Sequence, residues 1–151
     1  MANDLSAAPA ERAAFRFRAE LGEVRSVLRR AVARFARQIT AEDAGALELT
    51  LAEVLNNIVE HAYAGQPGGP ISLTIWREPA RLGCLVEDRG QAMPGLAPPD
   101  PPLAAIAGQA GDLPEGGWGW ALIRAMTEDL AYDRRQGVNR LRFGVPLAVA
   151  V

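Results

Sequence analysis

The sequence predicts an α+β fold, a two-layer sandwich in which helices cover one face of a mostly antiparallel sheet. Segments in which every second side chain is apolar indicate strands, and segments with apolar residues at helical spacing indicate helices. Several strands follow one another as hairpins without regular β-α-β units, which favours antiparallel pairing. With 151 residues, 49% of them hydrophobic, the chain is long enough for one domain with its own core.

The N-terminal part is predicted to hold one strand and one helix. Residues 1–14 are rich in alanine and small polar residues and are expected to form a flexible terminus. A short strand is expected at 15–18, where apolar and basic residues alternate. A helix is expected over 21–39, with apolar positions at Leu21, Val24, Leu28, Val32, Phe35 and Ile39. Its arginines form either a solvated outer face or a surface for an acidic partner.

The central helix begins after Thr40, a good N-cap residue, and continues through 47–63. Glu53, Asn57 and His61 follow one another at four-residue spacing on one face. A separate apolar stripe predicts the core-facing side and consists of Leu47, Leu51, Val54, Leu55, Ile58, Val59 and Ala62. Taken alone, the carboxylate, amide and imidazole would be only the polar side of a helix. Their significance depends on motifs later in the chain.

A β-hairpin is predicted next, with strands at 71–76 and 81–88. Cys84 lies in the alternating apolar run of the second strand, so it is expected to be a buried thiol and not a nucleophile. Asp88 ends that strand, and Gly90, a residue that permits a positive φ, follows two positions later. A carboxylate at a strand end can be presented to a ligand, although Asp-Arg-Gly is also common in turns.

A long segment without periodicity follows at 91–115, rich in proline and glycine, and is expected to be a lid or binding loop. A helix is predicted over 120–127. The final hairpin is expected to pair 130–134 with 141–145 around a turn at 136–139. The whole of 15–151 is therefore expected to be one domain.

Composition excludes several classes of function. All 16 basic residues are arginine, which excludes a P-loop lysine and Schiff-base chemistry. One cysteine and one histidine exclude cysteine zinc clusters and multi-histidine metal sites. A net charge of −2 does not suggest direct binding to nucleic acid. No leader opens the chain and no apolar run reaches membrane length, so we expect a cytoplasmic protein without a membrane partner.

Three polar motifs together are suited to a nucleotide. The Asn57 side-chain oxygen is a suitable ligand for Mg²⁺, which prefers oxygen and is commonly shared with substrate phosphates. The Asp88 carboxylate can accept a hydrogen bond from the exocyclic amine of adenine. Unpaired N–H groups at a glycine-rich helix start can bind the ATP phosphates, and here the glycines are Gly116, Gly117 and Gly119.

These motifs, at 53–63, 86–90 and 114–123, resemble the Bergerat ATP-binding fold of the GHKL superfamily. That superfamily includes gyrase, heat-shock chaperones, histidine kinases and mismatch-repair ATPases. Within it the chain resembles the small bacterial anti-sigma-factor serine kinases of the RsbW type. The resemblance covers about residues 15–147, nearly the whole chain.

The resemblance implies a role for each motif residue. Glu53 would be the base that orients an attacking serine, Asn57 the Mg²⁺ ligand and Asp88 the adenine contact. Further nucleotide contacts would come from His61, Gly90, Gly116, Gly117, Gly119 and Trp120. The implied partners are a STAS-type anti-anti-sigma protein phosphorylated on serine and a sigma factor or similar regulator, with the kinase as a homodimer.

Other functions remain open at this point. Ala92 stands where the family commonly has a second glycine, and 91–119 contains no basic residue. The γ-phosphate charge would then rest on Mg²⁺, backbone N–H groups and Arg124. These departures favour a kinase-inactive module that binds ATP to switch protein partners. A histidine-kinase catalytic domain without its phosphoacceptor helix and an α+β domain without a nucleotide are the remaining alternatives.

Overall fold

The structure, a computed structural model, describes residues 11–101 and 117–148. In this part of the chain five strands form one sheet in the order β1-β2-β3-β5-β4, and every neighbouring pair is antiparallel. The α+β prediction is therefore confirmed. The strands are β1 (Arg12–Arg18), β2 (Pro70–Arg77), β3 (Arg81–Asp88), β4 (Glu128–Arg135) and β5 (Val138–Pro146).

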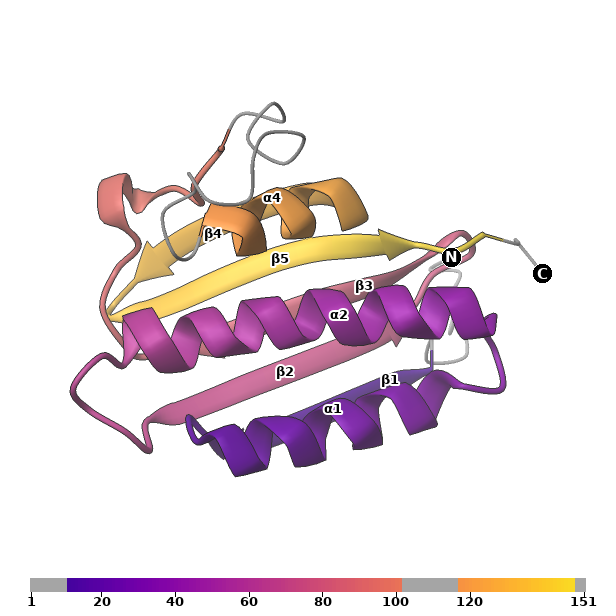
Figure 1. Cartoon of the computed structure of the whole chain (residues 1–151), viewed down its shortest axis with the longest axis horizontal. Coiled ribbons are helices and arrows are strands. Elements are labelled where there is room, and N and C mark those ends of the chain that lie inside the picture. The colour runs from indigo at the N-terminus through magenta and orange to yellow at the C-terminus, as the bar shows by residue number, and fades with distance from the viewer. Residues whose placement is uncertain (1–10, 102–116, 149–151) are drawn as a thin grey trace, which may run out of the picture.

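The described helices lie on one face of this sheet, with α2 between α1 and α4 (Figure 1). They are α1 (Leu21–Phe35), α2 (Ala41–Asn57) and α4 (Gly117–Met126), with the short turns η1 (Ile58–Ala62) and η2 (Pro94–Leu96). The predicted N-cap of α2 is present, because the Thr40 hydroxyl accepts a hydrogen bond from the Asp43 N–H at 3.1 Å. No described helix has both the length and the apolar character needed to cross a membrane.

Several predicted boundaries differ from the structure. The first helix ends at Phe35 and not at Ile39, and α4 begins at Gly117 and not at Trp120. β1 begins at Arg12, inside the segment expected to be a flexible terminus, because Arg12 to Ala14 pair with β2. The last hairpin turns at Gln136 and Gly137, whose φ values are 50° and 75°. Two successive positive φ values are typical of a tight two-residue hairpin turn. The predicted turn at 136–139 was therefore too long, and Asn139 belongs to β5.

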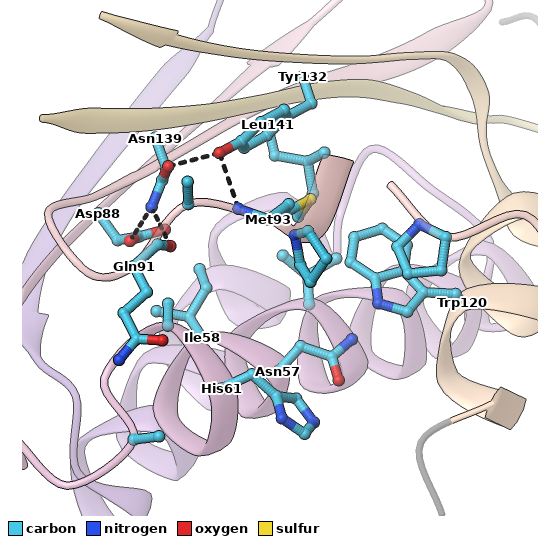
Figure 2. Close-up of a pocket in the computed structure, with 16 residues that line it drawn as sticks. Asn57, Ile58, His61, Asp88, Gln91, Met93, Trp120, Tyr132, Asn139 and Leu141 are labelled. Carbon is cyan, nitrogen blue, oxygen red and sulfur yellow. Dashed lines mark hydrogen bonds between the residues drawn. The ribbon is translucent and has the colours of Figure 1, made fainter. Parts of the chain in front are cut away.

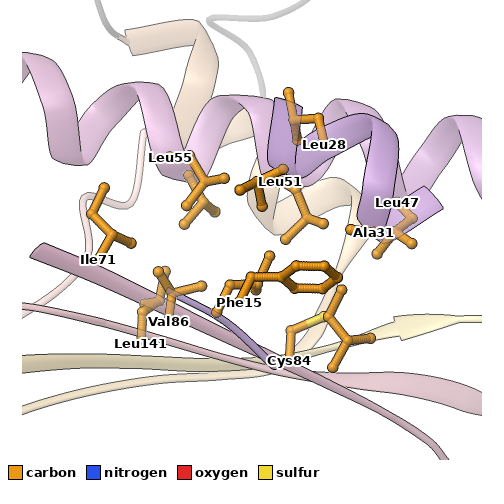
Figure 3. Close-up of a cluster of buried hydrophobic side chains, with 14 of the residues drawn as sticks. Phe15, Leu28, Ala31, Leu47, Leu51, Leu55, Ile71, Cys84, Val86 and Leu141 are labelled. Carbon is orange, nitrogen blue, oxygen red and sulfur yellow. The ribbon is translucent and has the colours of Figure 1, made fainter. Parts of the chain in front are cut away.

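The core is built from rows of side chains that run across the sheet and meet the helices. One row joins Phe15, Leu73, Val86 and Leu141 through the pairing of four strands, and all four side chains are buried. Figure 3 shows Phe15, Val86 and Leu141 beneath Leu51 and Leu55 of α2. The row containing Cys84 is buried as well, so the expected buried thiol is confirmed, and burial raises the pKa of that thiol.

The next row toward one end of the sheet is polar. It runs from Phe17 and Ile71 through Asp88 and Asn139 to Arg134, in register on all five strands. Because side chains alternate between faces along a strand, this row points to the helix side of the sheet, as the apolar row does. Three hydrophilic side chains thus replace the core at this end, below the last turn of the central helix.

Candidate functional site

A pocket of about 500 Å³ opens over this polar row. The end of α2, η1, the segment after β3, the start of α4 and the β4–β5 hairpin all contribute to its walls. Figure 2 shows the side chains that define it, which include Asn57, His61, Asp88, Met93, Trp120 and Asn139. Most of the lining is apolar and a few polar groups converge on it, an arrangement typical of small-molecule sites.

The structure brings several of the predicted site residues together. Asn57, His61, Asp88 and Trp120 line the pocket although they come from three different segments. Glu53 lies one turn before Asn57 on α2 and does not line this pocket. The glycines Gly117 and Gly119 belong to the start of α4, and Gly116 lies outside the described residues.

Asp88 is held with one oxygen fully engaged. Its Oδ1 accepts hydrogen bonds from the Gly90 N–H and from Asn139 Nδ2, both at 2.8 Å. Within the described chain no group donates to Oδ2, which leaves that oxygen for a ligand. Burial raises the pKa of Asp88, and the two hydrogen bonds and the nearby Arg134 charge oppose that rise. Because burial destabilises the ionised form of this carboxylate, a ligand that donates a hydrogen bond to it is favoured.

Glycine is required at position 90 because two backbone segments approach closely there, and not because of its backbone angles. Gly90 permits a positive φ but does not adopt one, since the glycines with positive φ in the described chain are Gly65, Gly68, Gly95 and Gly137. A Cβ at position 90 would lie 2.3 Å from the Ala62 carbonyl oxygen. That oxygen accepts a hydrogen bond from the Gln91 N–H at 2.7 Å, which ties the segment after β3 to the end of η1. Glycine lets these two backbones touch.

The central helix widens at the pocket. After Asn57, η1 continues it as a π-helical turn in which the Tyr63 N–H donates to the Ile58 carbonyl at 3.0 Å. The buried Tyr63 hydroxyl donates to the Pro70 carbonyl and accepts from the Arg89 N–H, both at 2.7 Å. Burial is the main cause that raises the pKa of Tyr63. This tyrosine fixes the turn after Asp88 relative to the end of the helix.

Asn57 has an incomplete set of partners. Its Nδ2 atom is enclosed and, within the described chain, is the one buried side-chain nitrogen or oxygen without a hydrogen bond. An unsatisfied buried amide costs stability unless a ligand or water completes its partners. Asn57 thus has the feature expected of a side chain that is completed by a ligand.

Glu53 lies against the start of α4. A Cβ added to Gly119 would lie 2.7 Å from Glu53 Oε2 and 3.7 Å from Asn57 Nδ2. The first and the third motif therefore meet, although 66 positions separate Glu53 from Gly119 in the sequence. Only glycine at position 119 leaves the Glu53 carboxylate in place. A carboxylate next to a helix N-terminus is also favoured by the helix dipole.

Three residues of the site, Asn139, Tyr132 and Arg134, belong to none of the sequence motifs. Asn139 Oδ1 accepts from the Tyr132 hydroxyl at 2.5 Å and from Arg134 at 2.7 Å. The Tyr132 hydroxyl also accepts from the Met93 N–H at 3.1 Å. The sequence pattern predicts a turn at Asn139, and the alternation on β4 carries no motif, so no signal along the chain points to these residues. Only the strand register places these side chains beside Asp88.

Arg124 does not reach the pocket as a free cation. It donates to the carbonyls of Pro99 at 2.8 Å and Pro98 at 3.0 Å, and it lies 3.6 Å from the Asp100 carboxylate. It therefore fixes the segment that leads away from the pocket wall. Ala92, which stands where the family commonly has a second glycine, lines the pocket and is exposed, so its methyl group is not packed in the core.

Comparison with known proteins agrees with this geometry. Residues 17–145 match the family of histidine kinase-like ATPase domains. The serine/threonine-protein kinase BtrW of Bordetella bronchiseptica is 37% identical over 97 residues, which are 63% of this chain and 65% of that protein. The aligned part thus spans just under two thirds of the relative's length.

A solved structure shares the fold. The RsbU and RsbW domains of Rv1364c from Mycobacterium tuberculosis align with a TM-score of 0.60 over 90% of this chain and 32% of theirs, at 16% identity. The family match runs through the central helix, the Asp88 strand end and the last hairpin, so it contains the pocket and the elements that build it. This chain therefore belongs to the family of histidine kinase-like ATPase domains.

Proposed function

We propose that this chain is an ATP- and Mg²⁺-dependent protein serine kinase that phosphorylates an anti-anti-sigma protein and sequesters a sigma factor or similar regulator. The observation that carries this proposal is the buried Asp88 carboxylate, which presents one unengaged oxygen to a mostly apolar pocket. An acceptor at that place suits the exocyclic amine of adenine, whereas the O6 acceptor of guanine would be repelled.

Asn57 fits the role of Mg²⁺ ligand by its chemistry. The described residues hold no cluster of three histidine, cysteine, aspartate or glutamate side chains for a metal. The unpartnered buried atom of Asn57 is Nδ2, a donor that suits a phosphate oxygen and not the cation. The Asn57 oxygen is the hard ligand that Mg²⁺ accepts when phosphates and water complete its shell. When bound, the ion would neutralise charge on the phosphates, and Asn57 would orient the terminal phosphate by holding it.

Glu53 is proposed as the base. In the reaction the serine oxygen forms a bond to the γ-phosphorus, the bond from that phosphorus to the bridging oxygen of ADP breaks, and the serine proton passes to the Glu53 carboxylate. Its place beside Gly119, at the helix start proposed to hold the phosphates, supports this role. Glu53 does not line the pocket that is proposed to bind adenine, and it lies one helical turn from Asn57. That position suits a group that acts at the phosphate end of the nucleotide.

The partners follow from the same proposal. The relative named above is a serine/threonine-protein kinase, which supports a protein substrate for this chain. The RsbW domain shares only the fold, so the sigma factor, the STAS-type anti-anti-sigma substrate, the homodimer and a cytoplasmic location stay proposals. Two of the arginines on α1 that could form a surface for an acidic partner already have partners within this chain, because Arg30 lies over the ring of Phe15 and Arg34 over that of Phe35.

Intact mass of both proteins tests the proposal. The chain is incubated with ATP, Mg²⁺ and each STAS-type protein of the same genome, and the gain of one phosphate on one partner is expected. ATP binding without any transfer would instead favour the second candidate, a module that uses ATP to select partners. One observation favours that candidate: Arg124, the basic residue of α4, is engaged by Pro98, Pro99 and Asp100 and does not serve the phosphates.

A further inference from the structure

The β4–β5 hairpin carries a hydrogen-bonded unit that belongs to none of the sequence motifs. Its centre is Asn139, which is 4% exposed. The Asn139 oxygen accepts from Tyr132 and Arg134, and its Nδ2 donates to Asp88 Oδ1 at 2.8 Å and to the Gln91 carbonyl at 2.9 Å. Two donors face one side of the amide and acceptors face the other, so only one orientation of the amide satisfies all of them.

This orientation determines the direction in which the Asp88 carboxylate meets a ligand. The two donors on Asp88 Oδ1 are the Gly90 backbone N–H and the Asn139 side-chain amide. With one oxygen engaged by both, tilting the carboxylate away from this direction would break two charge-assisted hydrogen bonds. Oδ2 is thereby fixed as a single acceptor in the pocket. A rigid acceptor favours a ligand whose donor lies in one place.

The unit itself is held from the outer strand. Tyr132 and Arg134 lie two residues apart on β4, so both point to the helix side of the sheet. Arg134 is in register with Asn139, and Tyr132 is in register with Leu141, two residues further along β5. Arg134 also donates to the Gly90 carbonyl at 2.9 Å, and its positive charge acts to lower the pKa of Asp88. Asn139 is thus locked by two side chains that do not touch Asp88 through any hydrogen bond.

We propose that Asn139, locked by Tyr132 and Arg134, is a positioning residue that gives the pocket its specificity for a base with an exocyclic amine. The unit acts through Asp88 and does not itself contact the base. This inference rests on the proposed function, because it assumes that Asp88 accepts a hydrogen bond from that base. A purely structural unit would instead support the pocket wall for any nucleotide alike.

Two ligands separate these roles: ATP and purine riboside triphosphate, which lacks the amine and is otherwise the same. Asn139→Ser removes the amide donor. We expect its ATP affinity to fall by about tenfold, the worth of one hydrogen bond to a charged group. Affinity for purine riboside triphosphate should stay within about twofold, since no coupled partner is lost there. Asn56→Ser on α2, whose side chain is not part of the pocket, is the matched control and should leave both affinities unchanged.

A second variant protects the test against loss of folding, since Asn139 is buried. Tyr132→Phe/Arg134→Met leaves Asn139 in place and removes both donors to its oxygen, because neither new side chain carries an N–H or O–H group. The amide can then turn, and the same selective loss of ATP affinity is expected. Tyr132→Phe/Arg135→Met is the control for the arginine, because Arg135 is the exposed next residue on β4. Thermal unfolding confirms that each variant is folded before binding is measured.

Equal weakening of both ligands in the folded variants, or no weakening of either, would overturn the role of Asn139. Failure of the proposed function has a different signature. In that case the wild-type chain would bind ATP and purine riboside triphosphate equally, and Asp88→Asn would change neither affinity. A wild-type preference for ATP that Asp88→Asn abolishes and the Asn139 variants leave intact would keep the nucleotide site and refute only the positioning unit.

Discussion

Replacing Asp88 with asparagine is the substitution whose outcome follows most directly from the geometry. The two donors that face Oδ1, from Gly90 and Asn139, would select the amide oxygen for that position. The amide nitrogen is then forced into the place of Oδ2. It would present N–H donors to the adenine amine, which is itself a donor and needs an acceptor at that place. The shape of the site stays the same while its hydrogen-bond polarity is reversed.

The size of the effect comes from that reversal. A hydrogen bond to a charged group contributes about 1.5–3 kcal/mol, so its loss should weaken ATP binding by about ten- to a hundredfold. Guanine has an acceptor at the position of the adenine amine, so the asparagine amide can donate to it. Asp88→Asn should therefore lower the ratio of ATP affinity to GTP affinity as well as the ATP affinity itself.

The thermal stability of Asp88→Asn without nucleotide should be equal to or higher than that of the wild type, although its ATP affinity is lower. The pKa of Asp88 is raised in the folded chain, mainly by burial. Such a carboxyl group contributes its full stability below its ordinary pKa, and that stability is lost as pH rises through the raised value. Asparagine carries no charge to bury, so Asp88→Asn should not share this loss. Without nucleotide, its unfolding temperature should equal or exceed that of the wild type at neutral pH, and the difference should vanish in acid.

Calorimetric titration with ATP and GTP, together with thermal unfolding across pH, measures all three effects. Asp133→Asn on β4 is the matched control, because Asp133 is exposed and Asp88 is 6% exposed. The control should leave nucleotide binding unchanged. Wild-type ATP affinity in Asp88→Asn would remove Asp88 from the site and refute the reasoning.

Three further substitutions test the other motifs. Glu53→Gln should leave ATP affinity unchanged and slow phosphoryl transfer by about two to four orders of magnitude, and near wild-type transfer would show that the base is a different residue. Gly119→Ala should keep the fold and displace the Glu53 carboxylate, so transfer should fall by about a hundredfold in rate assays; Gly45→Ala, with open space around it, is the control, and equal rates would contradict the contact. Gly90→Ala forces a Cβ onto the Ala62 carbonyl and should lower stability by about 1–3 kcal/mol in denaturant unfolding, with unchanged stability as the contrary result.

The sequence was sufficient for the fold class because each local signal agreed with the final packing. The apolar stripe from Leu47 to Leu55 is buried as predicted, and Thr40 caps the helix as its side chain suggested. Strand alternation predicted the helix-facing and the solvent-facing residues of β3, where Val86 is buried and Glu87 is not. Periodicity is a local property, so it can be read along the chain without knowledge of partners.

The site was only partly predictable, because part of it depends on contacts between distant segments. Asp88 and Asn57 carry recognisable spacing, but Asn139 reaches Asp88 only through the register of β3 and β5. Gly90 was expected for its backbone freedom, whereas the structure requires it for the approach of Ala62. A one-residue difference in the hairpin turn would place Asn139 on the other face of the sheet, and a turn length is not fixed by sequence periodicity.

Phosphate transfer is the most direct test of the central claim. The chain and its Glu53→Gln variant are incubated in parallel with ATP, Mg²⁺ and STAS-type proteins of the same genome, and intact masses are recorded over time. Glu48→Gln, an exposed position on the same helix, serves as the matched control. We expect one phosphate on a single partner with the wild type and with Glu48→Gln, and almost none with Glu53→Gln. ATP binding by the wild type with no phosphate on any partner would contradict the kinase assignment.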